Sequence, residues 1–229
     1  MSYFFKRVFS FRERPGVKMI VFDFDGTLAD TRELFLRIIS RHLAKFNISM
    51  TKNLIISFGN APLVDFISAS GLQRDFVRSV SASINSDFLS EYEKIKPCRG
   101  LKSLSEINLK KVIVSNNITP FIEKTLEYLR ADFFEEVYGA DKFTNKINAI
   151  KNLCKKYRVL PNEVVYVADK VIDVRIAREV GCYGVIVSNK TSWSTHSEIV
   201  EEKPDYMISS LGKLARVIER INSEQFAAV

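Results

Sequence analysis

Short apolar runs alternate along most of the chain with longer segments in which apolar residues recur at helical spacing. The short runs contain few polar residues, which is typical of strands buried on both faces of a sheet. They predict strands over residues 17–24, 111–114, 134–138, 164–167, 185–187 and 206–208. The segments between them predict helices over residues 101–107, 120–130, 147–157, 173–180 and 211–221. Strands that alternate with helices indicate a parallel sheet with helices on both faces, so we predict an α/β fold with a Rossmann-like core.

One segment interrupts this alternation. From Thr31 onward to about Lys94 the apolar residues keep the spacing of helices, and no strand pattern is convincing there. We therefore predict a small helical domain, inserted over residues 31–95 into a core domain that comprises residues 17–30 and 96–229. Residues 1–16, which are aromatic and basic, form an N-terminal extension.

The composition is that of an ordinary globular protein. The chain has 229 residues, of which 46% are hydrophobic and 27% are charged. No apolar run approaches the roughly 18 to 20 residues that a membrane-spanning helix needs. The three cysteines lie far apart, which suggests neither a disulfide framework nor a zinc site and favours a reducing compartment. We therefore expect a cytoplasmic protein.

The net charge of +7 is concentrated near the N-terminus, because five basic residues and one acidic residue fall within residues 1–18. A nucleic-acid-binding groove would spread its basic residues over the folded domain, so we do not expect a nucleic-acid partner. On a helical wheel Phe4, Phe5 and Phe9 share one side, and the basic residues lie largely opposite. Three alternatives follow for residues 1–16: peripheral contact with an anionic membrane, packing on this domain or on a second copy of it, or a cleaved targeting peptide.

Polar residues follow three of the predicted strands at the point where each strand ends. Asp23 and Asp25 follow the first strand, Ser115 and Asn116 follow the second, and Asp169 follows a third. Ligands of open parallel sheets bind beyond the carboxyl ends of the strands, so we expect these side chains to converge. Asp23 and Asp25 share one side of an extended chain, where two carboxylates repel unless a cation or a proton separates them. The pair therefore indicates a bound metal, a carboxylic acid, or both.

Two further candidates lie close to these strand ends. Lys146 follows an expected loop over residues 141–145, and Lys142 and Lys151 are alternatives to it. Asp173 lies one helical turn after Asp169. The set contains carboxylates, a hydroxyl and an ammonium group, but no cluster of histidines or cysteines. Such a set favours a hard cation such as Mg²⁺.

In these residues the chain resembles the haloacid dehalogenase (HAD) superfamily, and specifically its phosphoglycolate phosphatase-like branch. The first motif, Asp-x-Asp-Gly-Thr, matches residues 23–27, and the second, a strand that ends in serine or threonine, matches residues 112–116. The third, a lysine before a helix, best matches Lys146. The fourth, usually Gly-Asp-x-x-x-Asp, matches residues 168–173, with Ala168 in place of the glycine. The similarity covers nearly the whole chain beyond the N-terminal extension.

The resemblance implies a HAD fold and assigns roles to the acidic residues. Asp23 would be the nucleophile that forms an aspartyl-phosphate, and it would also bind Mg²⁺. Asp25 would protonate the leaving oxygen and then deprotonate the hydrolytic water, with its backbone carbonyl on the metal. Asp169 would complete the metal site, and Asp173 would be a further ligand or support one.

Other residues would contact the substrate. The resemblance implies that Ser115 and Lys146 hold the phosphoryl oxygens, and that the inserted helical domain is a cap over the site. A loop of this cap, over residues 57–62, matches the region that meets the leaving group in the same branch. The candidates for substrate binding are Gly26, Thr27, Asn116, Phe58 and Asn60.

The function expected from these residues is a Mg²⁺-dependent phosphatase, active as a monomer or homodimer, that hydrolyses a small phosphorylated metabolite such as a phosphoglycolate-like monoester. A phosphomutase shares all four motifs and is the main alternative. A phosphonatase would need a lysine from the inserted domain, such as Lys45 or Lys52. A non-catalytic binding or regulatory module on this fold is the alternative from another class, and the intact motifs argue against it.

Overall fold

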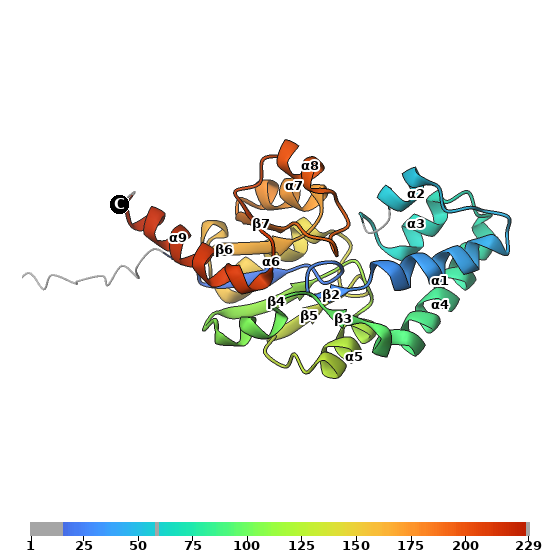
Figure 1. Cartoon of the computed structure of the whole chain (residues 1–229), viewed down its shortest axis with the longest axis horizontal. Helices are drawn as coiled ribbons and strands as arrows, with labels where there is room; N and C mark the ends of the chain where they lie inside the picture. The colour runs from blue at the N-terminus through green and yellow to red at the C-terminus, as the bar shows by residue number, and fades with distance from the viewer. Residues whose placement is uncertain (1–15, 58–59, 228–229) are drawn as a thin grey trace, which may run out of the picture.

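The structure, a computed structural model, describes residues 16–57 and 60–227. Within these residues six strands form one parallel sheet, in the order β5–β4–β1–β6–β7–β8 (Figure 1). The strands are β1 (Met19–Phe22), β4 (Lys110–Val114), β5 (Glu136–Tyr138), β6 (Val164–Ala168), β7 (Tyr183–Val187) and β8 (Tyr206–Ile208). Each strand expected from the sequence is present, and the predicted α/β class with a Rossmann-like parallel sheet is confirmed.

Strand β1 lies inside the sheet, where Val21 pairs with Val112 of β4 on one side and with Tyr166 of β6 on the other. Every side chain of β1 is fully buried. A strand with neighbours at both edges and helices on both faces has no side that meets water. This explains why β1 is apolar without alternation, and why the first polar residues come at its carboxyl end.

Helices cover both faces of the sheet. They are α5 (Thr119–Leu129), α6 (Lys146–Tyr157), α7 (Val171–Val180), α8 (His196–Glu201) and α9 (Leu214–Ala227). Successive residues of β1 point to opposite faces, so two separate cores form. Ile20 and Phe22 belong to the core that contains residues of α5 and α9, whereas Met19 and Val21 belong to the core formed with α6, α7 and α8.

Between β1 and β4 the chain leaves the sheet and forms a group of helices, which Figure 1 shows at one end of the molecule. The group consists of α1 (Arg32–Ala44), α2 (Lys52–Ser57), α3 (Leu63–Ala69), α4 (Arg74–Glu91) and the short 3₁₀ helix η1 (Tyr92–Lys94). Two short strands, β2 (Ala29–Asp30) and β3 (Lys96–Pro97), pair antiparallel where the chain leaves the core and returns. The inserted segment is helical, as the pattern predicts, and the division of the chain into domains at residues 31 and 95 stays a prediction.

A cluster of phenylalanines connects the inserted helices to the core. Phe35 of α1 stacks on Phe88 of α4 with ring centroids 4.1 Å apart. Phe121 of α5 packs against both rings, at 5.6 and 5.9 Å, and against Phe24 at 6.2 Å. Aromatic pairs contribute stabilisation beyond the area that they bury. Phe121 therefore joins α1 and α4 to the loop that follows β1.

Besides the short strands β2 and β3, which the pattern did not predict, the structure differs from the expected elements at η2 and at α8. Residues 101–107 form a 3₁₀ helix, η2 (Leu101–Glu106), and not the expected α-helix. Ser103 and Ser105 donate their hydroxyl hydrogens to carbonyl oxygens three residues earlier, which favours this tighter turn. Helix α8, which the hydrophobic pattern did not predict, begins after Thr195, whose hydroxyl oxygen accepts a backbone N–H of the first turn. The remaining 3₁₀ helices are η3 (Pro161–Glu163) and η4 (Leu211–Lys213), the second of which leads directly into α9.

The N-terminal extension predicted over residues 1–16 lies outside the described residues except for Gly16, so the three alternatives for it stay predictions. Over the ranges 16–57 and 60–227, none of the helices combines the length and hydropathy that crossing a bilayer requires.

The contacts of Phe121 predict a large effect on stability. Its side chain is fully buried, so Phe121→Ala should lower the free energy of unfolding by about 3–5 kcal/mol, because it leaves a cavity among three other rings. Urea denaturation followed by circular dichroism measures this change. Phe226 is 63% exposed, and Phe226→Ala is the matched control, with an expected change within about 0.5 kcal/mol. A cost below about 1 kcal/mol for Phe121→Ala would show that this cluster does not join the two parts.

Candidate active site

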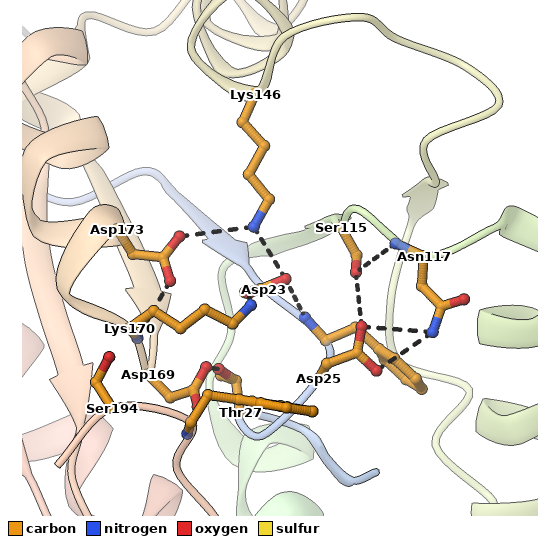
Figure 2. Close-up of polar contacts among 12 residues, drawn as sticks. Asp23, Asp25, Thr27, Ser115, Asn117, Lys146, Asp169, Lys170, Asp173 and Ser194 are labelled. Atoms are coloured by element: carbon orange, nitrogen blue, oxygen red, sulfur yellow. Dashed lines mark hydrogen bonds and ion pairs between the residues drawn. The ribbon is translucent and has the colours of Figure 1, made fainter. Parts of the chain in front are cut away.

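The polar residues at the strand ends converge, as the sequence predicts. Asp23 and Asp25 follow β1, Ser115 follows β4 and Asp169 follows β6, and Figure 2 shows their side chains around one small space. Asp23, Ser115 and Asp169 are at most 1% exposed. Lys146 from the start of α6 completes the group. The carboxyl ends of three neighbouring strands therefore form one buried polar site.

The backbone turn after β1 depends on Gly26. The backbone N–H of Asp23 continues the sheet by donating to Val167 O at 2.9 Å. Gly26 then adopts a φ of +76°, which glycine adopts at little cost. A Cβ atom at Gly26 would lie 2.3 Å from Asp169 Oδ2, so a side chain there would collide with the carboxylate. Thr27 is fully buried and donates to Asp169 Oδ1 at 3.3 Å, so in this structure it supports Asp169.

Both oxygens of Asp23 are held by positive or polar groups. Oδ1 accepts the backbone N–H of Phe24 at 2.8 Å and lies 3.1 Å from Lys146 Nζ, and Oδ2 accepts from Lys170 Nζ at 3.0 Å. Burial by itself raises the pKa of this carboxyl. The two ammonium groups outweigh burial and hold the pKa of Asp23 below its ordinary value. Asp23 is therefore an oriented, ionised carboxylate, which is the state that a nucleophile requires.

Lys146, the residue matched to the third motif, contacts Asp23 directly. Lys146 is the first residue of α6, and the side chain of the N-cap Asn145 accepts from Asn148 N at 3.1 Å. The ammonium group donates to the hydroxyl oxygen of Tyr166 at 3.2 Å. Lys142, one of the alternatives, instead donates to a main-chain carbonyl at the protein surface. The match of the third motif to Lys146 thus agrees with the geometry.

Asp25 lies in a different environment from Asp23. Its Oδ2 accepts from Ser115 Oγ at 3.4 Å, and the amide of Asn117 lies 3.3 and 3.4 Å from its two oxygens. Burial, together with the charge of Asp23, raises the pKa of Asp25 to about 6. A carboxyl group in this condition can give up and take back a proton near neutral pH.

Asn117 was not among the residues predicted for the site. Asn116, which was predicted, lines the cleft, whereas the Asn117 side chain orients Asp25. Residues 116 and 117 form a bend after β4, so the alternation of an extended strand does not predict where the Asn117 side chain lies.

Three carboxylates form a cluster that could hold a metal ion. Among the described residues, Asp23, Asp169 and Asp173 each offer an oxygen atom within 4.8 Å of the others, and all three are buried. Burial and the charge of Asp23 raise the pKa of Asp169 to about 8, in spite of the neighbouring Lys170. Oxygen ligands at this spacing fit a hard divalent cation of the Mg²⁺ kind.

Asp173 is also engaged by neighbouring groups. Its Oδ1 accepts from the Tyr166 hydroxyl at 2.7 Å and lies 3.6 Å from Lys146 Nζ, and its Oδ2 accepts the backbone N–H of Lys170 at 3.2 Å. These bonds fix Lys146 and the first turn of α7. Asp173 was expected either to bind the metal or to support a ligand of it, and these contacts favour the supporting role.

Lys170 is the second residue that the sequence analysis did not assign. It follows Asp169 at the end of β6, is only 4% exposed, and points its ammonium group at Asp23 (Figure 2). The fourth motif is defined by its two aspartates, and the resemblance assigns no role to the three residues between them.

A cleft of about 280 Å³ opens above Asp25, between the core and the inserted helices. The core side presents polar residues, including Asp25, Asn116, Asn117 and Lys170, together with Trp193. The residues of the inserted segment that line the cleft are Phe35, Ala61, Pro62, Leu63, Val64, Asn85 and Phe88. A ligand in the cleft would therefore meet polar groups at one end and mainly apolar side chains at the other.

The two residues predicted from the cap loop have different outcomes. Phe58 lies outside the described residues. Asn60 is exposed and lines a neighbouring hollow of about 350 Å³ together with Lys170 and Trp193. Contact of either residue with a substrate stays a prediction.

Comparison with known proteins agrees with this geometry. A family described as haloacid dehalogenase-like hydrolase matches residues 20–187. A phosphoglycolate phosphatase of Vibrio vulnificus is 25% identical in an alignment that covers 88% of this chain and 96% of the relative. A protein named putative pyrophosphatase PpaX, from Caldanaerobacter subterraneus, is 22% identical over 91% of this chain and 98% of its own length.

Solved structures show the same fold. The structure of a predicted phosphoglycolate phosphatase from Haemophilus somnus superposes with a TM-score of 0.76 at 19% identity, over 88% of this chain and 97% of the other. A predicted phosphatase from Clostridium acetobutylicum superposes with a TM-score of 0.75 at 19% identity, over 90% and 100% of the two chains. The resemblance predicted from the motifs is thus confirmed, and the chain belongs to the haloacid dehalogenase-like hydrolase family, as a phosphatase of its phosphoglycolate phosphatase-like branch.

Proposed function

We propose that this phosphatase hydrolyses a small phosphate monoester through an aspartyl-phosphate on Asp23, with Mg²⁺ as cofactor. The observation that carries the proposal is the difference between two neighbouring carboxyl groups. Asp23 is held ionised by Lys146 and Lys170, whereas Asp25 has a raised pKa and faces the cleft. Two carboxyl groups in such contrasting environments suit a nucleophile and a general acid.

In the first step, an oxygen of Asp23 forms a bond to phosphorus while the bond from phosphorus to the leaving oxygen breaks. Asp25 gives its proton to that leaving oxygen, which departs as an alcohol. The contacts of Asp25 with Ser115 and Asn117 keep its carboxyl group directed at the same space as Asp23. The products of this step are the alcohol and phosphorylated Asp23.

In the second step, a water molecule attacks the phosphorus of the aspartyl-phosphate. Asp25, now ionised, takes a proton from that water, and the bond between Asp23 and phosphorus breaks to release inorganic phosphate. Both carboxyl groups thereby return to their starting states. A pKa near 6 suits this double duty, since the group must give and take a proton within one turnover.

Lys146 and Ser115 stabilise the charge that spreads over the phosphoryl oxygens. The Lys146 ammonium group lies 3.1 Å from Asp23 Oδ1, next to the position where phosphorus would bond, and Ser115 Oγ lies on the side of Asp25. Asn116 and the backbone at Gly26 and Thr27 would border the same group.

Mg²⁺, when bound, would neutralise the repulsion between the carboxylate and the phosphate. Asp23 and Asp169 would hold it, with the backbone carbonyl of Asp25 as the resemblance implies and with Asp173 in support. The oxygen-only donor set of this cluster supports the assignment.

The cleft supports a small substrate. Its volume of about 280 Å³ must hold the phosphoryl group and the leaving group together. The polar residues Asn85 and Asn116 and the cation Lys170 could meet a second polar or anionic group, as in a phosphoglycolate-like monoester. The names of the relatives, phosphoglycolate phosphatase and pyrophosphatase, support hydrolysis over the phosphomutase alternative.

Replacing the nucleophile tests the mechanism. Asp23→Asn should lower kcat by at least about a thousandfold, because a carboxamide does not form the acyl-phosphate. Steady-state hydrolysis of a phosphate monoester measures the loss, and circular dichroism checks the fold. The matched control is Asp132→Asn, at an exposed position outside the site, which should keep full activity. Activity within tenfold of the wild type in Asp23→Asn would exclude the mechanism.

Removal of metal tests the cofactor. Dialysis against a chelator should abolish hydrolysis, and excess Mg²⁺ should restore it, because phosphate and Asp23 otherwise repel each other. Asp169→Ala should weaken Mg²⁺ binding by at least about tenfold, measured by isothermal titration calorimetry. Full activity after complete chelation would contradict the requirement for a metal.

A panel of phosphate esters tests the substrate class. With Mg²⁺ present, monoesters with two or three carbon atoms should give kcat/KM values at least about tenfold above those of nucleoside monophosphates, because the cleft is small. Phosphate release measures each rate. A preference for nucleotides would show that the cap opens further than this cleft and that the proposed substrate class is wrong.

A further inference from the structure

Lys170 brings a second ammonium group to a site that already has Lys146. Its Nζ atom lies 3.0 Å from Asp23 Oδ2, on the side of Asp23 away from Lys146, which contacts Oδ1 (Figure 2). The side chain is 4% exposed, so almost no water solvates its charge. A buried ammonium group without solvation requires anionic partners.

The backbone fixes the direction of this side chain. Lys170 precedes the first residue of α7 in an extended conformation, with φ −113° and ψ 155°. Its N–H donates to Asp173 Oδ2 at 3.2 Å. The turn from β6 into α7 thus aims the side chain back across the carboxyl end of the sheet, toward Asp23.

The partners of Lys170 are the residues that would hold the metal. Its ammonium group contacts Asp23 Oδ2 at 3.0 Å, its backbone N–H contacts Asp173 Oδ2 at 3.2 Å, and Asp169 is the preceding residue. These three residues are also the cluster whose oxygens lie within 4.8 Å of one another. The ammonium group therefore supplies positive charge at the place where a divalent cation would supply it.

We propose that Lys170 is a built-in cation that neutralises the Asp23, Asp169 and Asp173 cluster in the metal-free protein and competes with the divalent cation for Asp23. This inference rests on the proposed function, because it takes that cluster to be the metal site. Lys146 and the Phe24 N–H contact Oδ1 of Asp23, on the side proposed for the phosphorus, so Oδ2, where Lys170 lies, is the oxygen left for a metal ion. Two cations in contact with one oxygen repel each other, so metal binding requires the ammonium group to withdraw.

The displaced ammonium group would move toward the cleft. Lys170 also lines the cleft, beside Asp25 and Trp193. A lysine side chain has four rotatable bonds, so it can move between Asp23 and the cleft without a change in the backbone. The affinity for the metal therefore depends on the competition between Lys170 and the metal ion for Asp23, as well as on the metal ligands.

Three variants measured by isothermal titration calorimetry with MgCl₂ test the competition. Lys170→Met keeps most of the length and removes the charge, and it should bind Mg²⁺ at least about tenfold more tightly than the wild type. Lys170→Arg keeps a positive charge and should bind no more tightly than the wild type. Lys142→Met, which removes an exposed lysine outside the site, should stay within about twofold. Equal or weaker binding by Lys170→Met would overturn the proposal.

Thermal unfolding gives a readout that does not depend on calorimetry or activity. Without metal, Lys170→Met should melt below the wild type, because buried carboxylates lose their cation, and Mg²⁺ should raise its melting temperature more than that of the wild type. If the variant folds only when Mg²⁺ is present, that result also supports the proposal. A metal-free melting temperature equal to that of the wild type, with no larger effect of Mg²⁺, would contradict it.

Measuring hydrolysis by the wild type in the presence of chelator shows whether the proposed function fails or this inference fails. Hydrolysis without metal, combined with tighter binding by Lys170→Met, would refute the Mg²⁺ requirement and support the inference. A strict Mg²⁺ requirement combined with unchanged affinity in Lys170→Met would support the proposed function and refute the inference. Absence of Mg²⁺ binding in both proteins would also refute the inference.

Discussion

Four carboxyl groups come together in a buried space at the carboxyl ends of β1 and β6. They belong to Asp23, Asp25, Asp169 and Asp173, none of which is more than 9% exposed. In such a space, carboxylates at short distances cannot all be ionised unless cations lie among them. Much of the surrounding structure follows from this constraint. Two lysines from different helix starts contact Asp23, and hydroxyl and amide groups contact the other carboxyl groups.

The same constraint produces the chemistry of the site. Asp23 and Asp25 come from one loop, but only Asp23 contacts the lysines, so the pKa values of the two groups move in opposite directions. One group is kept as an anion and the other can carry a proton, although the sequence places them two residues apart. In the mechanism that we propose, the environment of each residue, and not its type, makes one carboxyl group the nucleophile and the other the acid.

Much of the fold follows from the sequence because strands buried on both faces must be apolar throughout. That rule locates β1, β4 and β6, and the polar residues at their ends then locate the site. The rule does not find strands that are too short to show a pattern, such as β2 and β3. The spacing of apolar residues also does not separate an α-helix from a 3₁₀ helix, as in η2, where serine hydroxyls favour the tighter turn. The bounds of the cap domain and the roles of the site residues remain predictions that experiments must test.

The two residues that the sequence analysis missed show how local geometry limits such reasoning. Asn117 follows β4 in a bend, where its backbone N–H donates to Ser115 Oγ at 3.2 Å and its side-chain amide contacts Asp25, so the hydrophobic pattern does not place it. The period of an extended strand would place Lys170 on the side opposite Asp169. The turn into α7 reverses this direction and brings the ammonium group to Asp23, and that turn is visible only in the structure.

Direct detection of the covalent intermediate tests the central claim, which is that Asp23 is the nucleophile. The enzyme would be mixed with substrate and Mg²⁺, quenched within one turnover and treated with hydroxylamine, which converts an acyl-phosphate to a hydroxamate, and the modified peptide would be sequenced by mass spectrometry. The account predicts a hydroxamate at Asp23 and none in Asp23→Asn. A hydroxamate at another residue, or turnover in a single phase with no modified peptide, would contradict it.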